Sequence, residues 1–142
     1  MRRLFVAAVL AVFGHAAAAA DSYICIPEKS TGFTFNKGNR QWDMARFAVE
    51  GKKYFVKNEK GSWQWLESED TDRSPVRCSD FNNYDSLSCT GFYEIVFNRK
   101  SLRFQKIYGE GYVTSPEAIG TDKEGAATPY MEIGTCSVQQ PQ

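Results

Sequence analysis

The sequence contains a single histidine, His15, and it lies within the first twenty residues. If that segment is a cleaved signal peptide, no imidazole remains. Ser-His-Asp and Cys-His catalysis and histidine metal sites are then excluded. The cysteines do not have the close spacing of a zinc site, and no strand-glycine-helix unit for phosphate binding occurs. The sequence therefore predicts a protein without catalytic residues, metal or cofactor.

Positive charge is not in excess either. Lysine and arginine number 17, and so do aspartate and glutamate. Nucleic acids and anionic membranes require concentrated basic charge, so neither is an expected partner. Beyond the N-terminus no apolar run is long enough to span a bilayer. We expect a soluble domain without a membrane span.

The first twenty residues have the three parts of a secretory signal peptide. Arg2 and Arg3 provide the positive start, residues 4–14 form an apolar run, and residues 16–20 are all alanine. Cleavage after Ala20 would leave residues 21–142 as one domain with a net charge of −2. The sequence therefore predicts a periplasmic or secreted protein with a single domain.

Four cysteines remain after cleavage, and an even number in an exported chain indicates two disulfides. Three connectivities are possible for four cysteines. Cys78 and Cys89 bracket a short polar stretch, whereas Cys25 and Cys136 lie near the two ends of the domain. The simplest pairing is therefore Cys78 with Cys89 and Cys25 with Cys136.

Alternating polar and apolar residues separated by turn residues dominate the chain, and helical periodicity is nearly absent. This pattern predicts an all-β fold, a small antiparallel barrel or sandwich of seven or eight strands. A disulfide between the first and last strands favours the barrel, because closure brings those strands together. The expected strands lie around residues 33–35, 42–49, 52–57, 62–67, 92–97, 102–108, 112–114 and 129–133.

Turn residues suggest how the first of these strands pair. Glu50-Gly51 has the composition of a two-residue turn, and residues 58–61 that of a four-residue turn ending in glycine. The expected cross-strand pairs are Phe47 with Tyr54, Val56 with Trp63, and Tyr54 with Trp65. All five side chains would then share the core face.

A second hairpin is expected around a four-residue loop at residues 98–101. This loop would pair Phe97 with Leu102 and Ile95 with Phe104, and would collect their side chains on one face. The carboxylates of Glu94 and Glu132 sit among apolar neighbours, but by alternation we expect both on the outer face. Arg103 and Gln105 are also expected to face outward. No inward-facing carboxylate pair is therefore predicted.

Aromatic residues provide the candidate ligand site. They could line a cavity for a small apolar ligand at the mouth of the barrel, or they could fill its core. Both interpretations remain open at this point. The candidate residues are Trp42, Tyr54, Trp63 and Trp65.

Two charged groups are expected to be solvated surface features. The acidic run lacks the spacing of a calcium loop and does not place two carboxylates across a cleft. The basic group surrounds a predicted hairpin and alternates with glutamates. The acidic residues are Glu67, Glu69, Asp70 and Asp72, and the basic residues are Lys52, Lys53, Lys57 and Lys60.

The tail at residues 129–137, with Asn98 and residues 102–104 upstream, resembles a group of small exported bacterial proteins; this resemblance implies no particular activity. The Tyr23-Ile24-Cys25 opening and the late Cys136 are more weakly similar to the periplasmic inhibitors of c-type lysozyme, which are small eight-stranded barrels. The Ser-Gly-x-x-Tyr motif of those inhibitors is absent.

The sequence therefore predicts an exported, non-enzymatic binding or interaction protein of the cell envelope. Its partner would be a protein or a small apolar ligand. Lysozyme inhibition and a small carboxylate-only hydrolase are the alternatives.

Overall fold

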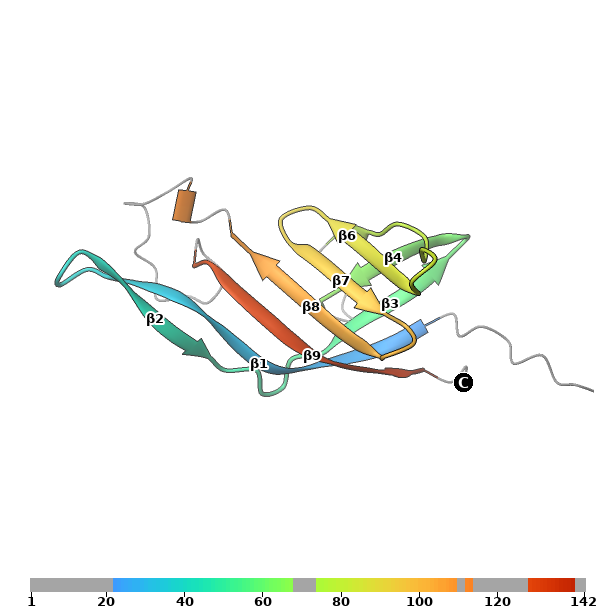
Figure 1. The fold of residues 1–142 in the computed structure, drawn as a ribbon, viewed down its shortest axis with the longest axis horizontal. Coiled ribbons are helices and arrows are strands. Elements are labelled where there is room, and N and C mark those ends of the chain that lie inside the picture. Colours follow the sequence, from blue (N-terminus) through green and yellow to red (C-terminus); the bar gives the residue numbers. More distant parts are fainter. Residues whose placement is uncertain (1–21, 68–73, 110–111, 114–127, 140–142) are drawn as a thin grey trace, which may run out of the picture.

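The computed structural model describes residues 22–67, 74–109, 112–113 and 128–139. In these residues a single antiparallel sheet of nine strands forms the fold (Figure 1). The predicted signal peptide lies outside the described residues. The strands are β1 (Ser22–Asn36), β2 (Gln41–Phe47), β3 (Tyr54–Glu59), β4 (Ser62–Leu66), β5 (Val76–Arg77), β6 (Ser86–Thr90), β7 (Glu94–Asn98), β8 (Arg103–Tyr108) and β9 (Tyr130–Val138).

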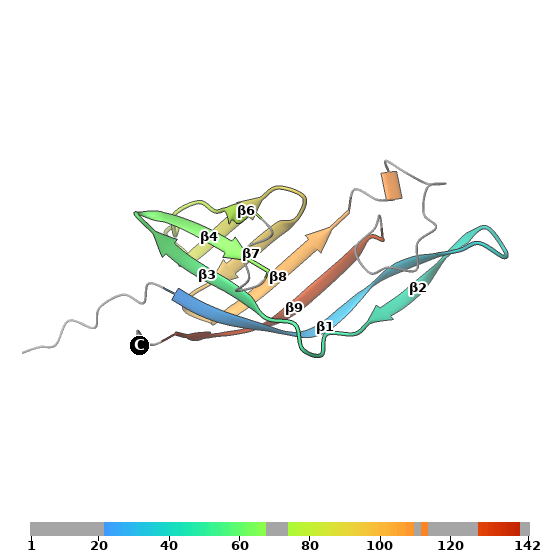
Figure 2. The same cartoon turned by 180° about the vertical axis from the view of Figure 1, so that it is seen from behind.

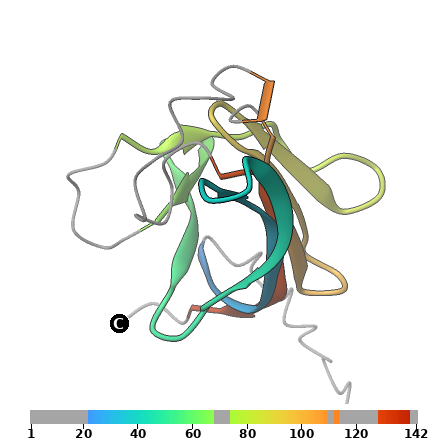
Figure 3. The ribbon, with the colours of Figure 1, turned by 90° about the vertical axis from the view of Figure 1, so that its left-hand side faces the viewer.

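Eight of these strands follow one another around a barrel in the order β5-β4-β3-β1-β9-β8-β7-β6. The two ends of this path meet where Cys78 pairs with Cys89, both as a β-bridge and as a disulfide. Beside this disulfide the Ser79 N–H donates to the Ser88 carbonyl over 2.8 Å. The predicted antiparallel barrel is confirmed as a nearly closed one, which Figure 3 shows from the side of the β1–β2 hairpin.

The second disulfide joins Cys25 of β1 to Cys136 of β9. The two cysteines face each other directly in the register of these neighbouring strands. Both predicted disulfides are therefore confirmed. Each one links adjacent strands, so the two crosslinks hold the barrel at two different places around its wall.

Strand β2 does not pair as expected. It pairs with the second half of β1, with Phe47 opposite Ser30, while β3 pairs with the first half of β1, with Tyr54 opposite Cys25. The predicted pair of Phe47 with Tyr54 is therefore wrong. The Glu50-Gly51 turn itself is present, because the Lys52 N–H donates to the Val49 carbonyl. It connects two strands that lie one after the other along β1 instead of closing a hairpin.

The β3–β4 hairpin is shifted by two residues from the expected register. Val56 lies opposite Trp65, not Trp63. The turn contains only Lys60 and Gly61, with φ of 52° and 82°. Two successive positive φ angles match the twist of a two-residue hairpin, so the strands extend further than predicted. A shift of two preserves the face of every side chain, and the predicted core face survives.

The β7–β8 hairpin is shifted in the same way. Phe97 lies opposite Phe104, and Ile95 lies opposite Lys106. The loop runs from residue 99 to residue 102, one residue later than expected, with Leu102 at a φ of 56°. The Asn98 Oδ1 accepts hydrogen bonds from the N–H groups of Lys100 and Ser101, which stabilises this later turn. Again the predicted faces are preserved and the predicted pairs are wrong.

Two further differences concern single elements. Tyr112 and Val113 are helical, so a strand is not formed at that point. Conversely, β6 begins in the polar stretch between the cysteines and continues through Cys89 to Thr90, where no strand was expected. Its Leu87 and Cys89 alternate with polar residues and are completely buried. Thr114 lies outside the described residues.

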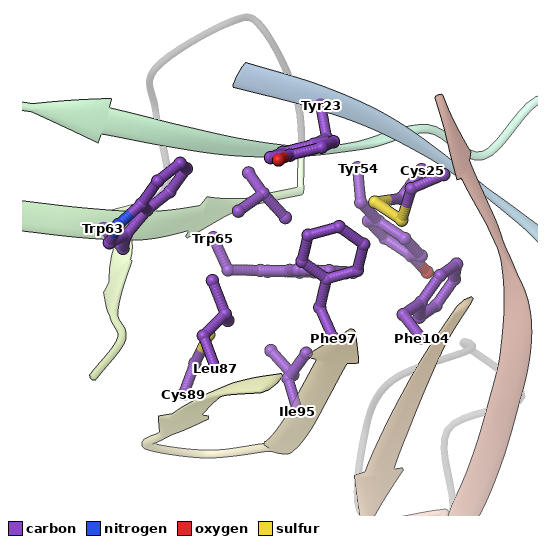
Figure 4. Packing of buried hydrophobic residues seen from close by; sticks show 12 residues of the cluster. Tyr23, Cys25, Tyr54, Trp63, Trp65, Leu87, Cys89, Ile95, Phe97 and Phe104 are labelled. Atoms are coloured by element: carbon purple, nitrogen blue, oxygen red, sulfur yellow. A yellow bond between two sulfur atoms is a disulfide. The ribbon is translucent and has the colours of Figure 1, made fainter. Parts of the chain in front are cut away.

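The hydrophobic core lies between the strands of the barrel (Figure 4). Trp65 and Phe97 are fully buried near its centre, and Trp63 is 8% exposed. Of the five predicted core residues only Phe47 lies outside this cluster; it is half-buried against Tyr130. The buried hydrophobic cluster consists of Tyr23, Cys25, Tyr54, Val56, Trp63, Trp65, Leu87, Cys89, Ile95, Phe97, Phe104 and Cys136.

Gly134 allows β9 to pass close to its neighbours. A Cβ atom there would lie 2.2 Å from the Ile26 carbonyl oxygen and 2.7 Å from Cε1 of Phe104.

We therefore expect Gly134→Ala to lower the free energy of unfolding by about 3 kcal/mol, because the backbone of β1 must move. Urea denaturation measures this change. Gly109→Ala, where a Cβ would meet nothing within 4 Å, is the control. Equal effects of the two changes would contradict the close packing.

Candidate functional site

The inner face of the barrel carries two charged residues, Lys106 on β8 and Glu132 on β9. They lie opposite each other in the β8–β9 register and are only 2% and 0% exposed. The expectation that Glu132 faces outward is therefore wrong, whereas Glu94 is exposed as expected. Because Gly134 and Cys136 point inward, alternation along β9 also turns Glu132 inward.

Both carboxylate oxygens of Glu132 have partners. Its Oε1 accepts a hydrogen bond from the Lys52 ammonium over 2.9 Å, and its Oε2 accepts one from the Tyr54 hydroxyl over 2.5 Å. Lys52 was expected on a solvated edge, but it forms an ion pair with Glu132 across 80 residues of sequence. A buried carboxylate is stable only with such partners, so these contacts explain how Glu132 is tolerated.

Lys106 is held by a second carboxylate and by aromatic rings. Its ammonium forms an ion pair with Glu67, whose side chain is only 14% exposed. The Lys106 Nζ lies 3.9 Å from the ring centre of Tyr93, 4.8 Å from Tyr54 and 5.7 Å from Tyr130. Ring faces attract a desolvated ammonium. Glu67 therefore belongs to the interior and not to a solvated acidic loop; the other acidic residues of that run lie outside the described residues.

Three tyrosines form the next layer of the interior. Tyr108 lies opposite Tyr130 in the β8–β9 register, and Tyr93 packs against both. The pKa of Tyr130 is raised far above the usual value, mainly by burial and next by the neighbouring Tyr93. The pKa of Tyr54 is also raised, mainly by burial and next by the hydrogen bond to Glu132. Both hydroxyls remain protonated, so they act as hydrogen-bond donors.

We call Lys52, Tyr54, Glu67, Lys106 and Glu132 the interior ion-pair cluster. Its two lysines and two glutamates balance in charge. Each oxygen of Glu132 accepts one hydrogen bond from within this cluster. In the part of the chain that the structure describes, no group of three His, Cys, Asp or Glu could hold a metal ion. The arrangement stabilises charge inside the barrel: Lys106 and Glu132 are buried, and the Lys52 side chain is 27% exposed.

The four aromatic residues of the candidate ligand site do not lie together. Tyr54 and Trp65 pack at 5.0 Å in the core, and Trp63 packs there against Phe81. Trp42 lies on β2, away from that core, and its ring contacts Phe35 at 5.5 Å. The structure thus brings three of the four into one packed cluster and places the fourth on a different element.

A second candidate surface is the hairpin of β1 and β2, which we call the arm (residues 30–47). Figures 1 and 2 show that it extends well beyond the barrel. Strand β1 pairs with β9 only as far as Gly32, whereas its pairing with β2 continues to Asn36. The end of the arm is therefore a two-stranded ribbon.

The outer face of the arm is apolar and exposed. Phe33 and Met44 lie opposite each other and are 47% and 87% exposed. Phe35 packs against Trp42 on the same face, two pairs further along the register, and Trp42 also contacts Tyr112. Exposed large apolar side chains that share a face are characteristic of interaction sites.

Comparison with protein-family models, with curated proteins and with solved structures yields no match. Among the described residues, no helix is long and apolar enough to cross a membrane. The two disulfides fit a protein folded outside the cytoplasm.

Sequence reasoning missed the interior ion-pair cluster, although a signal for part of it exists. Lys106 is two residues from Phe104 on the same strand, and Glu132 is four residues from Cys136. Once Phe104 and Cys136 are assigned to the core, alternation places both charges inside. No pattern along the chain indicates that Lys52 or Glu67 lies beside them, because those contacts join distant segments.

We expect Lys106→Met to lower the free energy of unfolding by about 3 kcal/mol, because it leaves the Glu67 carboxylate without the ammonium that pairs with it. The double variant Lys106→Met/Glu67→Gln should recover part of this loss, since it removes the carboxylate charge together with the ammonium. Urea denaturation provides the measurement, with Lys53→Met on the exposed surface as the control. A loss for Lys106→Met no larger than that of the control would show that the ion pair does not matter for stability.

High pH should destabilise the fold through Tyr54. The pKa of this tyrosine is raised in the folded state, so only the unfolded chain releases its proton above about pH 10. Its stabilising contribution is present in full below that pH and is lost as the pH rises further, by about 1.4 kcal/mol per pH unit. Denaturation from pH 9 to 11 should give a shallower decline for Tyr54→Phe. Identical slopes for the two proteins would refute this linkage.

Proposed function

We propose that this protein is an exported, non-enzymatic binding protein of the cell envelope, periplasmic or secreted, that recognises a protein partner with the outer face of its arm. The observation that carries the proposal is the exposed pair of Phe33 and Met44 on a hairpin that extends beyond the barrel. Export is supported by the predicted signal peptide and by the two disulfides.

The interior of the barrel favours recognition at the surface. Trp65 and Phe97 are fully buried and pack in the core cluster. The polar half is occupied by the interior ion-pair cluster, whose charges are paired with one another. A hydrolase would need at least one accessible carboxylate, and Glu132 is fully buried with both oxygens in use. This geometry supports binding over hydrolysis.

The arm offers the chemistry that a folded protein partner would recognise. Large apolar side chains at the centre of an interface contribute most of the affinity, and polar residues at its margin exclude solvent. Phe33 and Met44 supply the centre. Arg46 lies two residues from Met44 on the same strand, and the exposed Lys37 and Arg40 lie in the turn at the end of the arm, so positive charge outweighs the single negative charge of Asp43 on the arm. A partner with an apolar depression and acidic margins fits this surface.

Site-specific photo-crosslinking in the source cells tests the proposal. With a photoreactive residue at position 33 on the arm we expect an adduct of one discrete mass, different from that of two copies of this chain. The same residue at position 94, exposed on the barrel wall, should give no such adduct. Met44→Lys should remove the adduct at position 33 without lowering the melting temperature, because Met44 is 87% exposed.

Two results would overturn the proposal. One is the absence of any adduct at position 33 other than that of two copies of this chain. The other is the same adduct in equal yield at position 94, which would show that the arm has no special role.

A further inference from the structure

The outer edge of β2 carries unpaired backbone groups. The Phe33 N–H donates to the Pro129 carbonyl, on the β9 side of β1. Backbone groups of successive residues in a strand point to alternate sides, so those of Gly32 and Thr34 point toward β2. Their partners are Ala45 and Asp43. The residues of β2 that alternate with Asp43 and Ala45 must therefore direct their N–H and C=O groups away from β1.

These outward residues are Trp42, Met44 and Arg46. Within the described residues β2 pairs with β1 alone, so no strand meets this edge. Proteins protect such edges with proline, with charged side chains (lysine above all) or with a β-bulge. The sequence of β2, QWDMARF, contains two charged residues, Asp43 and Arg46, but neither proline nor lysine, and its register with β1 is regular over all seven residues. The edge is therefore open to pairing with another strand.

We propose that the edge of β2 pairs antiparallel with β2 of a second copy of this chain, with Met44 at the two-fold axis. In a two-fold antiparallel pair of β2 strands, residues whose backbone groups point outward lie opposite each other. Only the register centred on Met44 gives each of the three outward residues a partner of this kind. Met44 then lies opposite Met44 of the second copy, and Trp42 lies opposite its Arg46. Each of these pairs exchanges two backbone hydrogen bonds.

The side chains suit this arrangement. Opposed residues on an antiparallel pair lie close enough for direct contact. The guanidinium of Arg46 would meet the indole of Trp42, which is the favoured combination for a cation–π contact. The exposed thioether of Met44 would be covered by its own equivalent, and no like charges would face each other. The strand is thus complementary to itself.

The pairing deepens the proposed function and rests on it. Phe33 and Met44 form a row across two strands of one arm. In the paired form the row would run over four strands, from Phe33 of one copy through both methionines to Phe33 of the other. The apolar face available to a partner would then be twice as long and symmetric.

Sedimentation velocity of the purified protein without its signal peptide tests the pairing. The interface is small, so we expect a weak, reversible dimer whose average mass rises toward that of two chains between about 1 μM and about 1 mM. Met44→Lys places two ammonium groups opposite each other and should weaken the dimer at least about tenfold. A mass that stays at one chain throughout, or unchanged association of Met44→Lys, would overturn the pairing.

Cysteine crosslinking tests the register. Met44→Cys should form an intermolecular disulfide on mild oxidation, because each thiol faces its equivalent. Asp43→Cys, on the same strand and also exposed, would face Ala45 of the second copy and should crosslink poorly. Equal crosslinking of the two would overturn the register. These experiments use purified protein alone. If the two copies do not pair, the photo-crosslinking test of a protein partner is unaffected, and if no partner is crosslinked, the test of the pairing is unaffected.

Discussion

Strand β1 is the element on which the rest of the structure depends, because it hydrogen-bonds to three other strands. Its first half lies between β3 and β9 in the barrel wall, and its second half continues into the arm with β2. The register between β1 and β9 shifts between Pro27 and Lys29, where the strand passes from one role to the other. Such an irregularity bends a strand and increases its twist. The disulfide from Cys25 to Cys136 holds β1 in place, and closing a loop of this length stabilises the fold by about 5 kcal/mol.

The barrel interior is divided into layers by the cross-strand registers. One layer is apolar, with Phe97 and Phe104 opposite each other beside Gly134. The next contains Lys106 and Glu132, and the tyrosines follow. Burying these charges costs several kcal/mol for each ion before pairing compensates. The pairing is nearly complete, so the polar half is held in one arrangement by directional contacts, and the apolar half is held by packing.

The arm poses a different physical problem. A two-stranded ribbon in water is only marginally stable, and it cannot bury its own apolar side chains. Folding of the barrel does not require Phe33 or Met44 to be apolar, since neither contributes to the core. A partner that covers them, and a second strand that satisfies the edge of β2, would account for both features. Recognition is the physical explanation that we favour for this part of the molecule.

The all-β class, the simplest pairing of the four cysteines and the inward faces of β3, β4, β7 and β8 could be predicted from the residues alone. These properties follow from alternation with a period of two and from cysteine positions, and a register error of two residues leaves them unchanged. The pairing of β2 with β1 could not be predicted, because a turn at Glu50-Gly51 is compatible with either partner and loop closure hardly distinguishes them. The interior ion-pair cluster could not be predicted either, because Lys52 and Glu67 meet residues far away in the chain. Alternation defines a side for each residue, but the closure of the barrel determines which distant side chains share that side.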